Sequence, residues 1–380
     1  QVLSTLLHAS MIAPLVLILQ RLGLGRILFW AILSLLSCGF VVLNTVYVWP
    51  KFIAVTYLLT CYLVVFDDGR LSFSPTQKII LIAVSGSSAM LCHGGSVFAL
   101  LPIFLIALGR GISYCYKVLV PSGMLMVVCY TPWIFYQRVI DPPGDRLLKW
   151  HFAGHPSITD KSFGEIIVSA YSALTLHEWL ANQWANIERV FDRAWQIVYW
   201  IPEIFKIPFH APHHHFLQDI TFGNFFFSMW FLSPLFALIA YALSRTLSTR
   251  EIVTTNDDLR WLTQISILGL CIWIVLMFRP GSTSNHLGTY FIWISWFLVA
   301  VSLAARTHVL YLACAAVLNT LLFAQFYVLD YVWFERPAQE LYMYYSGFAF
   351  SVLLISLYWV QWASNQTMAR DKQLTEAAHS

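Results

Sequence analysis

Charge is what this sequence has least of. Only 11% of its residues are Asp, Glu, Lys or Arg, against roughly 25% in a typical soluble domain. Because 59% of the residues are hydrophobic, the composition predicts a polytopic membrane protein rather than a soluble one. The formal net charge of +3 gives no electrostatic footprint for nucleic acid, and we expect no nucleic-acid partner.

Paired cysteines are also missing. The seven cysteines occur singly, without a C-x-x-C pair, and none falls in the long polar segment 137–224. This distribution predicts neither a disulfide framework nor a cysteine-rich zinc site. Single cysteines in apolar runs are typical of small buried hydrophobic residues.

The apolar runs lack charges at their centres. All the basic residues and all the acids fall between the runs or at their ends. Ion- or proton-coupled transporters usually mark their path with charged groups inside the membrane. The pattern therefore argues against coupled transport.

What the sequence does contain is a series of apolar runs. A helix needs roughly 20 apolar residues to cross a bilayer, and eleven runs come near that length. The predicted fold class is all-α, with about eleven transmembrane helices. The runs are 2–20, 27–47, 52–66, 78–92, 96–109, 118–136, 225–243, 262–278, 288–305, 308–329 and 342–362.

Basic residues predict the orientation of these runs. Twelve Lys and Arg residues fall on one side, whereas short loops on the other side hold only Lys51, Arg279 and Arg336. By the positive-inside rule the twelve are cytoplasmic, so the long segment is extracytoplasmic. The chain then divides into a first part of the bundle, the extracytoplasmic segment, a second part of the bundle and a cytoplasmic tail, over 1–136, 137–224, 225–364 and 365–380.

The extracytoplasmic segment carries apolar residues at helical spacing over 163–199, with Trp179 and Trp184 among them. Tryptophan is enriched where a membrane meets water. We therefore expect an amphipathic helix that lies on the outer leaflet. A small packed subdomain is the alternative.

Cations on the extracytoplasmic side are candidate phosphate ligands. Arg279 lies in a loop without an acid, and guanidinium binds phosphate oxygens bidentately; His286 follows in the same loop. Lys51 begins a run after Trp49-Pro50, where it is either a phosphate contact or an interfacial anchor.

Two further clusters add candidates for substrate binding. His93, before Gly94-Gly95, interrupts an apolar stretch and either caps a turn or contacts substrate. The rigid turn at Pro142-Pro143-Gly144 brings together polar residues that either bind substrate or only solvate a loop. These residues are Asp141, Asp145, Arg146, Lys149 and His151.

Two other patterns predict no chemistry. The histidines at 210 and 213–215 match no recognised metal-site spacing, so we expect no metal and no other cofactor. Asp67-Asp68 falls on the cytoplasmic side and is interpreted as a solvated loop rather than a catalytic pair.

Taken together, the sequence resembles the GT-C superfamily of integral-membrane glycosyltransferases. The similar features are the many runs, the Trp49-Pro50-Lys51 element, the His93-Gly94-Gly95 turn and the long extracytoplasmic segment. The resemblance implies transfer of a sugar from a polyprenyl-phosphate donor to a glycan, lipid or protein acceptor, at the outer face of a bacterial inner (plasma) membrane. A non-enzymatic lipid or polysaccharide transporter or flippase, and a membrane scaffold, remain alternatives.

The resemblance also implies where the catalytic carboxylate lies. Such enzymes carry it on the first extracytoplasmic loop, directly after the first span. The charge count places Gln1 outside, so we expect a span and an acidic loop to precede it, and the catalytic residue to be unknown from this sequence. Within the sequence, Asp141 and Asp145 are the candidates.

Overall fold

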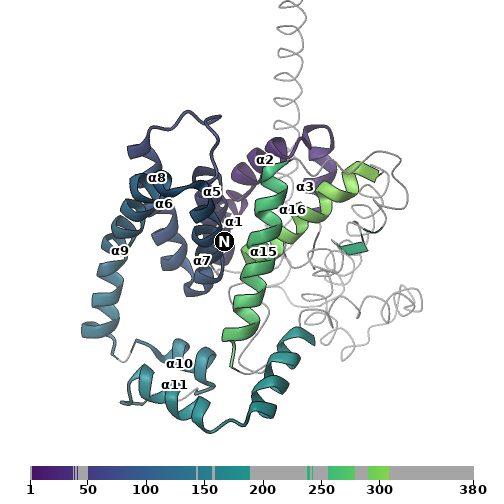
Figure 1. The fold of residues 1–380 in the computed structure, drawn as a ribbon. Helices are drawn as coiled ribbons and strands as arrows, with labels where there is room; N and C mark the ends of the chain where they lie inside the picture. The colour runs from purple at the N-terminus through teal and green to yellow at the C-terminus, as the bar shows by residue number, and fades with distance from the viewer. Residues whose placement is uncertain are drawn as a thin grey trace, which may run out of the picture. The chain divides into compact units, whose positions relative to one another are not determined.

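A computed structural model describes most of the first half of the chain and two later stretches (Figure 1). The described residues are 2–36, 38, 41, 50–142, 144–155, 159–188, 238–239, 242, 256–278 and 290–307. Within these ranges every regular element is a helix and no strand occurs. The all-α prediction is confirmed for this part of the chain.

The chain forms two compact units, each built from segments distant in sequence. The first comprises Gln1–Phe52, Ala194–Leu259 and Phe297–Ser380, and the second comprises Ile53–Arg193 and Arg260–Trp296. Two helices run across the division, α15 (Asp257–Leu276) and α16 (Tyr290–Thr307). The second unit holds most of the residues that the sequence singles out.

In the first unit, the expected run 2–20 is two helices rather than one. Helix α1 (Val2–Ala9) ends before α2 (Ile12–Arg21) begins. Pro14 has no N–H to donate to the carbonyl of Ser10, and the amide of Ala13 bonds to that carbonyl at 3.2 Å instead. A short turn and α3 (Leu28–Leu36) follow.

The end of α2 is held to the start of α15 by a buried ion pair. The guanidinium of Arg21 lies 2.8 Å from the carboxylate of Asp258, with both side chains under a tenth exposed. The amide of Asn256 also donates to the carbonyl of Arg21 at 3.2 Å. These contacts join segments more than 230 positions apart.

In chain order, the second unit begins with longer helices and continues with shorter ones. The long helices are α5 (Lys51–Val65), α6 (Pro75–Cys92), α7 (Val97–Ala107) and a continuous helical stretch from Ile112 to Ile140 that contains α9 (Val120–Phe135). The shorter ones are α10 (Arg146–Ala153), α11 (Phe163–Ser172) and a helix over 176–188.

Two glycines allow helices of this unit to approach closely. A Cβ on Gly86 of α6 would lie 2.6 Å from the sulfur of Met126 on α9, and one on Gly269 of α15 would lie 2.9 Å from the carbonyl oxygen of Phe98 on α7. Real carbon atoms do not come this near, so larger residues would push the helices apart. α6 and α9 lie side by side in Figure 1.

Two helices are long and apolar enough to cross a membrane, Ile112–Ile140 and Asp257–Leu276. Five shorter apolar helices of 10–17 residues accompany them in the described ranges. The predicted runs that begin at 225, 308 and 342 lie outside those ranges, apart from 238–239 and 242. Two candidate spans are therefore supported, and the total of eleven stays a prediction.

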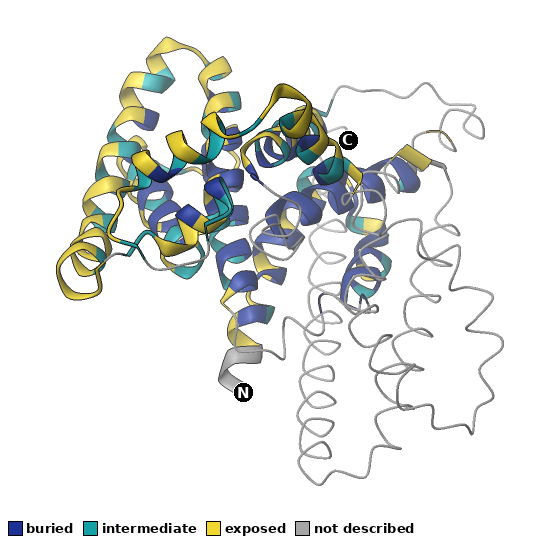
Figure 2. Ribbon diagram, turned by 90° about the horizontal axis from the view of Figure 1, so that it is seen from below, coloured by how far each residue is buried: buried dark blue, intermediate teal, exposed yellow. Residues whose placement is uncertain are grey.

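The first candidate span leaves its apolar surface uncovered. Only 17% of its most apolar window is buried inside the protein, whereas the core helix of a soluble domain is mostly buried. Met124, Val127 and Val128 are 68, 59 and 65% exposed, and the ribbon is largely yellow on the side where α9 lies (Figure 2). Such a surface suits contact with lipid tails.

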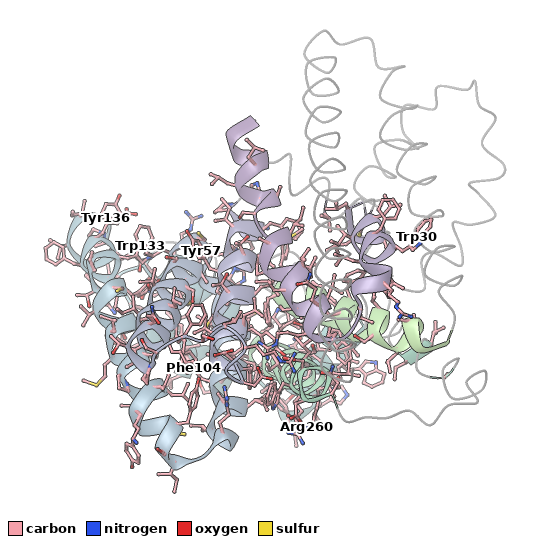
Figure 3. The ribbon with its side chains drawn as sticks, turned by 90° about the horizontal axis from the view of Figure 1, so that it is seen from above. Trp30, Tyr57, Phe104, Trp133, Tyr136 and Arg260 are labelled. Carbon is pink, nitrogen blue, oxygen red and sulfur yellow. The ribbon has the colours of Figure 1, made fainter. Side chains whose placement is uncertain are left out.

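The C-terminal end of this span carries an aromatic pair. The rings of Trp133 and Tyr136 are stacked with their centroids 5.4 Å apart and lie side by side in Figure 3. Exposed aromatic residues of this kind are typical of the level where hydrocarbon meets headgroups. The pair is typical of a membrane boundary and lies at the end of the span that leads into α10.

The expected single helix over 163–199 is wrong. α11 ends at Ser172 and a new helix occupies 176–188, the last described residues of this stretch. Each has its own capping box: Ser162 and Glu165 cap α11, and Thr175 and Glu178 exchange the same bonds at the start of the next helix. Because each box satisfies the free amides of a first turn, it fixes a helix start.

Candidate functional site

Three segments of the second unit meet at the end of α15. The amide of Phe278 donates to the carbonyl of His151 on α10 at 3.0 Å. The ring of Tyr171 on α11 meets the ring of Phe278 edge to face, with centroids 5.2 Å apart. Asn186 donates to the carbonyls of Met277 and Ile274 at 2.9 and 3.2 Å. We call these six residues the α15-end junction: His151, Tyr171, Asn186, Ile274, Met277 and Phe278.

The junction supplies hydrogen-bond donors to the carbonyls at the end of α15. The last four carbonyls of a helix have no partner within it, and Asn186, which is fully buried, satisfies two carbonyls at this end of α15. The backbone is thus held at Met277 and Phe278. Arg279, the candidate phosphate ligand, is the next residue in the chain and lies outside the described residues.

The helix over 176–188 has an inverted polarity. Its inward side carries amides, with Gln183 and Asn186 buried and Asn182 half-buried. Its outward side carries apolar residues, with Leu176, Leu180 and Trp184 exposed by 71, 52 and 61%. A helix on a soluble domain shows the opposite pattern.

Helix α10 repeats this inversion. Leu147 and Leu148 are 63 and 49% exposed, whereas Lys149 is 2% exposed. The ammonium of Lys149 lies 2.8 Å from the carboxylate of Asp145 and 3.3 Å from the carbonyl of Thr159. Lys149 therefore ties α10 to the following loop, and a contact with substrate would have to use the third proton of its ammonium.

The other candidates of this segment lie nearer the surface. Asp141 and Arg146 are exposed, and His151 is half-buried with its ring stacked on Trp150 at 5.1 Å. The turn that contains Asp141 and precedes α10 is closed by the side-chain amide of Gln137, which donates to the carbonyl of Gly144 at 3.0 Å. The structure thus places the candidates of 141–151 on one short turn and helix, with only His151 at the junction.

His93 caps a turn. Its Nδ1 accepts a hydrogen bond of 3.1 Å from the amide of Gly95, and the hydroxyl of Ser96 donates to the carbonyl of Ala89 at 2.9 Å. The local geometry fits the capping interpretation that the sequence left open.

The remaining candidates are Lys51 and the residues outside the described ranges. Lys51, the first residue of α5, is 7% exposed and belongs to the first compact unit, so its side chain is enclosed by protein. Outside the described residues lie Arg279, His286, and the histidines at 210 and 213–215.

A second polar cluster forms where α5 ends. Arg110 donates to the carbonyls of Val65 and Asp67, the latter at 3.0 Å, and the hydroxyl of Tyr114 donates to Val65 at 2.7 Å. The Asp67 carboxylate is fully buried and lies 2.8 Å from the ammonium of Lys78. The solvated-loop interpretation is therefore wrong for Asp67, although Asp68 is exposed.

The protonation of Asp67 follows from these contacts. Burial by itself raises the pKa of the carboxyl, but hydrogen bonds from Lys78 and from the amide of Leu71, with the charge of Lys78, hold the pKa below its ordinary value. A cation at a helix C-terminus is also favourable to the helix dipole. This cluster has the properties of a structural cap on α5.

Sequence reasoning missed Gln183 and Asn186. Their signal was present, because Asn182, Gln183 and Asn186 recur at spacings that fall on one side of a helix. Among the described residues no group of histidines, cysteines and acids is arranged to hold a metal ion.

The chain matches no protein-family model, no curated protein and no solved structure.

Proposed function

We propose that this protein is a membrane glycosyltransferase that takes a sugar from a polyprenyl-phosphate donor at the extracytoplasmic face. The observation that carries the proposal is the α15-end junction, where polar groups from α10 and from the 176–188 helix meet the end of a candidate span directly before Arg279. A lipid-linked substrate needs polar groups at the end of a membrane span, because its phosphate lies at the headgroup level while its chain stays in lipid.

The reaction follows from the chemistry of the donor. The acceptor hydroxyl attacks the anomeric carbon and forms the new glycosidic bond, while the bond from that carbon to the phosphate oxygen breaks. The polyprenyl phosphate leaves with the electron pair, and a carboxylate takes the hydroxyl proton. Cations that neutralise the phosphate stabilise the oxocarbenium-like transition state.

The candidates differ in their suitability for these roles. Asp145 is engaged by Lys149 at 2.8 Å, whereas Asp141 is exposed and is the more accessible of these two candidate carboxylates. Arg279 is assigned to the phosphate, and His151 is hydrogen-bonded to Phe278, the residue that precedes Arg279 in the chain. Arg146 and His93, which belong to the second unit, are retained as further contacts, while Lys51 and His286 stay predictions from the sequence.

The test compares Arg279→Ala with Arg279→Lys in the purified full-length protein. Loss of a charge-assisted contact to phosphate costs roughly 1.5–3 kcal/mol, or about 10- to 150-fold in affinity. Because a point charge cannot reproduce a bidentate fork, we expect Arg279→Lys to be nearly as impaired as Arg279→Ala. Binding of a polyprenyl-phosphate hexose and release of polyprenyl phosphate are the measurements.

Two outcomes count against the proposal. Wild-type protein that binds no polyprenyl phosphate, with or without a sugar, would leave it without a substrate. Movement of a labelled donor across a vesicle membrane with its glycosidic bond intact would instead favour the transporter.

A further inference from the structure

Helix α10 turns a charged residue inward and leucines outward. The side chain of Lys149 is 2% exposed, whereas Leu147 and Leu148 are 63 and 49% exposed. Single exposed leucines are common on protein surfaces, but leucines exposed on a helix whose lysine is buried are not. Because a surface helix of a soluble domain buries its apolar side, the arrangement of α10 points to an apolar environment outside the protein.

The inward side of α10 is held by contacts to two other helices. The ring of Phe152 is stacked on the ring of Phe98 at the start of α7, with centroids 6.3 Å apart, and meets the ring of Phe163 of α11 edge to face at the same distance. Lys149, Phe152 and Ala153 recur at helical spacing and form this inward side. A rotation of α10 that buried its leucines would therefore break the contacts of Phe152.

The turn before α10 folds back on the last turn of the candidate span Ile112–Ile140. The amide of Gly144 donates to the carbonyl of Gln137 at 3.3 Å, and a Cβ on Gly144 would lie 2.5 Å from the Cβ of Gln137, so the approach requires glycine. Gln137 directly follows Tyr136 of the stacked aromatic pair. Helix α10 thus begins two residues after a contact with the part of the span that is typical of a membrane boundary.

We propose that α10 lies in the membrane–water interface and inserts Leu147 and Leu148 among the headgroups and upper acyl chains of phospholipids. The occupant follows from continuity, because Val139 and Ile140, the last residues of the span, are 60 and 64% exposed, and the closed turn brings the leucines next to them in the chain. The inference goes beyond the proposed function, since it requires the span to cross a membrane and no particular reaction. Through the hydrogen bond of His151 to Phe278, such a helix holds the α15-end junction at headgroup level.

The test places a nitroxide spin label on Leu147→Cys in the cysteine-free full-length protein, reconstituted into vesicles of phosphatidylcholine alone. Collisions of the label with oxygen, which concentrates in hydrocarbon, are compared with collisions with a nickel chelate, which stays in water. The matched positions are Val128→Cys, exposed near the middle of the span, and Ala173→Cys, in the exposed turn after α11. We expect the ratio of oxygen to chelate collisions at position 147 to exceed the ratio at 173 several-fold and to fall below the ratio at 128.

The other outcomes overturn the inference. A ratio at position 147 equal to that at 173 places the leucine in water, and a ratio equal to that at 128 places it in the centre of the bilayer. Protection of position 147 from both reagents shows that protein covers it, either a second copy of this chain or another part of the same one. A ratio at position 128 as low as that at 173 removes the membrane span on which the inference depends. Donor binding by the same protein, measured separately, decides the proposed function.

Discussion

The carboxamide of Asn186 lies 2.9 Å from the carbonyl oxygen of Met277, although 91 positions separate the two residues in the sequence. This contact sets the position of the 176–188 helix along α15, since it attaches the helix to the end of that candidate span. It also sets its rotation, because the side opposite Asn186 must face outward. One buried amide thus accounts for the position of the helix and for the side that it turns toward α15.

Replacement of Asn186 by alanine is expected to destabilise the protein. It removes two hydrogen bonds and leaves the carbonyls of Ile274 and Met277 without that partner, at an expected cost of about 1–3 kcal/mol. Thermal unfolding in detergent measures the loss. Asn182→Ala, at a half-buried position of the same helix, is the control, and an equal drop in both variants would contradict the assigned role.

The pair of Lys149 and Asp145 is expected to behave as a buried structural pair. Lys149→Met should cost roughly 3–5 kcal/mol, because it leaves the partner charge uncompensated, whereas replacing both residues by apolar ones should recover most of the stability. Melting temperatures of the single variant and of Lys149→Met with Asp145→Leu provide the comparison. If the recovered double variant has lost donor binding while Asp145→Leu alone has not, Lys149 contacts the substrate as well.

Hydropathy predicted where many helices lie, because burial in lipid or protein selects apolar residues over a whole helix. The expected runs 52–66 and 78–92, for example, correspond to α5 and α6. The positions at which helices begin and end were less predictable, since they depend on single residues. Pro14 divides the first run, and Thr175 with Glu178 divides the amphipathic segment.

The candidate site was harder to predict than the helices. The sequence left Lys149 either as a substrate contact or as part of a solvated loop, and its ion pair depends on burial that no local pattern encodes. Asp67 was expected in solvent, and it is buried because Lys78 and Arg110 reach it from other helices. The contact of His151 with Phe278 likewise joins segments whose neighbourhood only the fold determines.

The ion pair of Asp67 predicts a dependence of stability on pH. Because the pKa of Asp67 is lowered in the folded protein, its contribution is present in full above the unfolded pKa of about 3.9 and is lost as pH falls through the folded pKa. The difference in stability between wild type and Asp67→Asn should be constant from about pH 7 to about pH 5 and shrink toward about pH 3. A difference that grows on acidification would show that the pKa is raised instead.

The predicted topology can be tested at two described loop positions. In a cysteine-free background, Ala173→Cys lies in the turn between α11 and the 176–188 helix, and Ser72→Cys lies in the loop between α5 and α6; both positions are exposed. The charge asymmetry predicts that a membrane-impermeant thiol reagent labels position 173 from outside and position 72 only after the membrane is opened. The reverse pattern would place the α15-end junction on the cytoplasmic side and remove the proposed donor site.

The last prediction concerns the apolar side of the 176–188 helix. Leu176, Leu180 and Trp184 are spaced four residues apart and are all more than half exposed, while Asn186 holds the helix at the end of α15. If α15 spans a membrane, an apolar stripe beside its end is stabilised by insertion among lipid headgroups and upper acyl chains. The alternative is a small subdomain in water, in which the stripe would be solvated.

An environment-sensitive fluorophore on Leu180→Cys distinguishes the two. Insertion predicts blue-shifted emission after reconstitution into vesicles and stronger quenching by nitroxides near the headgroups than by nitroxides at the bilayer centre, because the end of a span lies at the interface and not at the midplane. The same fluorophore on Ala173→Cys, in the exposed turn, should be quenched less by lipid-borne nitroxides and more by a water-soluble quencher. Emission at position 180 that responds only to the water-soluble quencher would contradict insertion, and it would leave the inverted polarity of the helix to be explained by a protein partner in water.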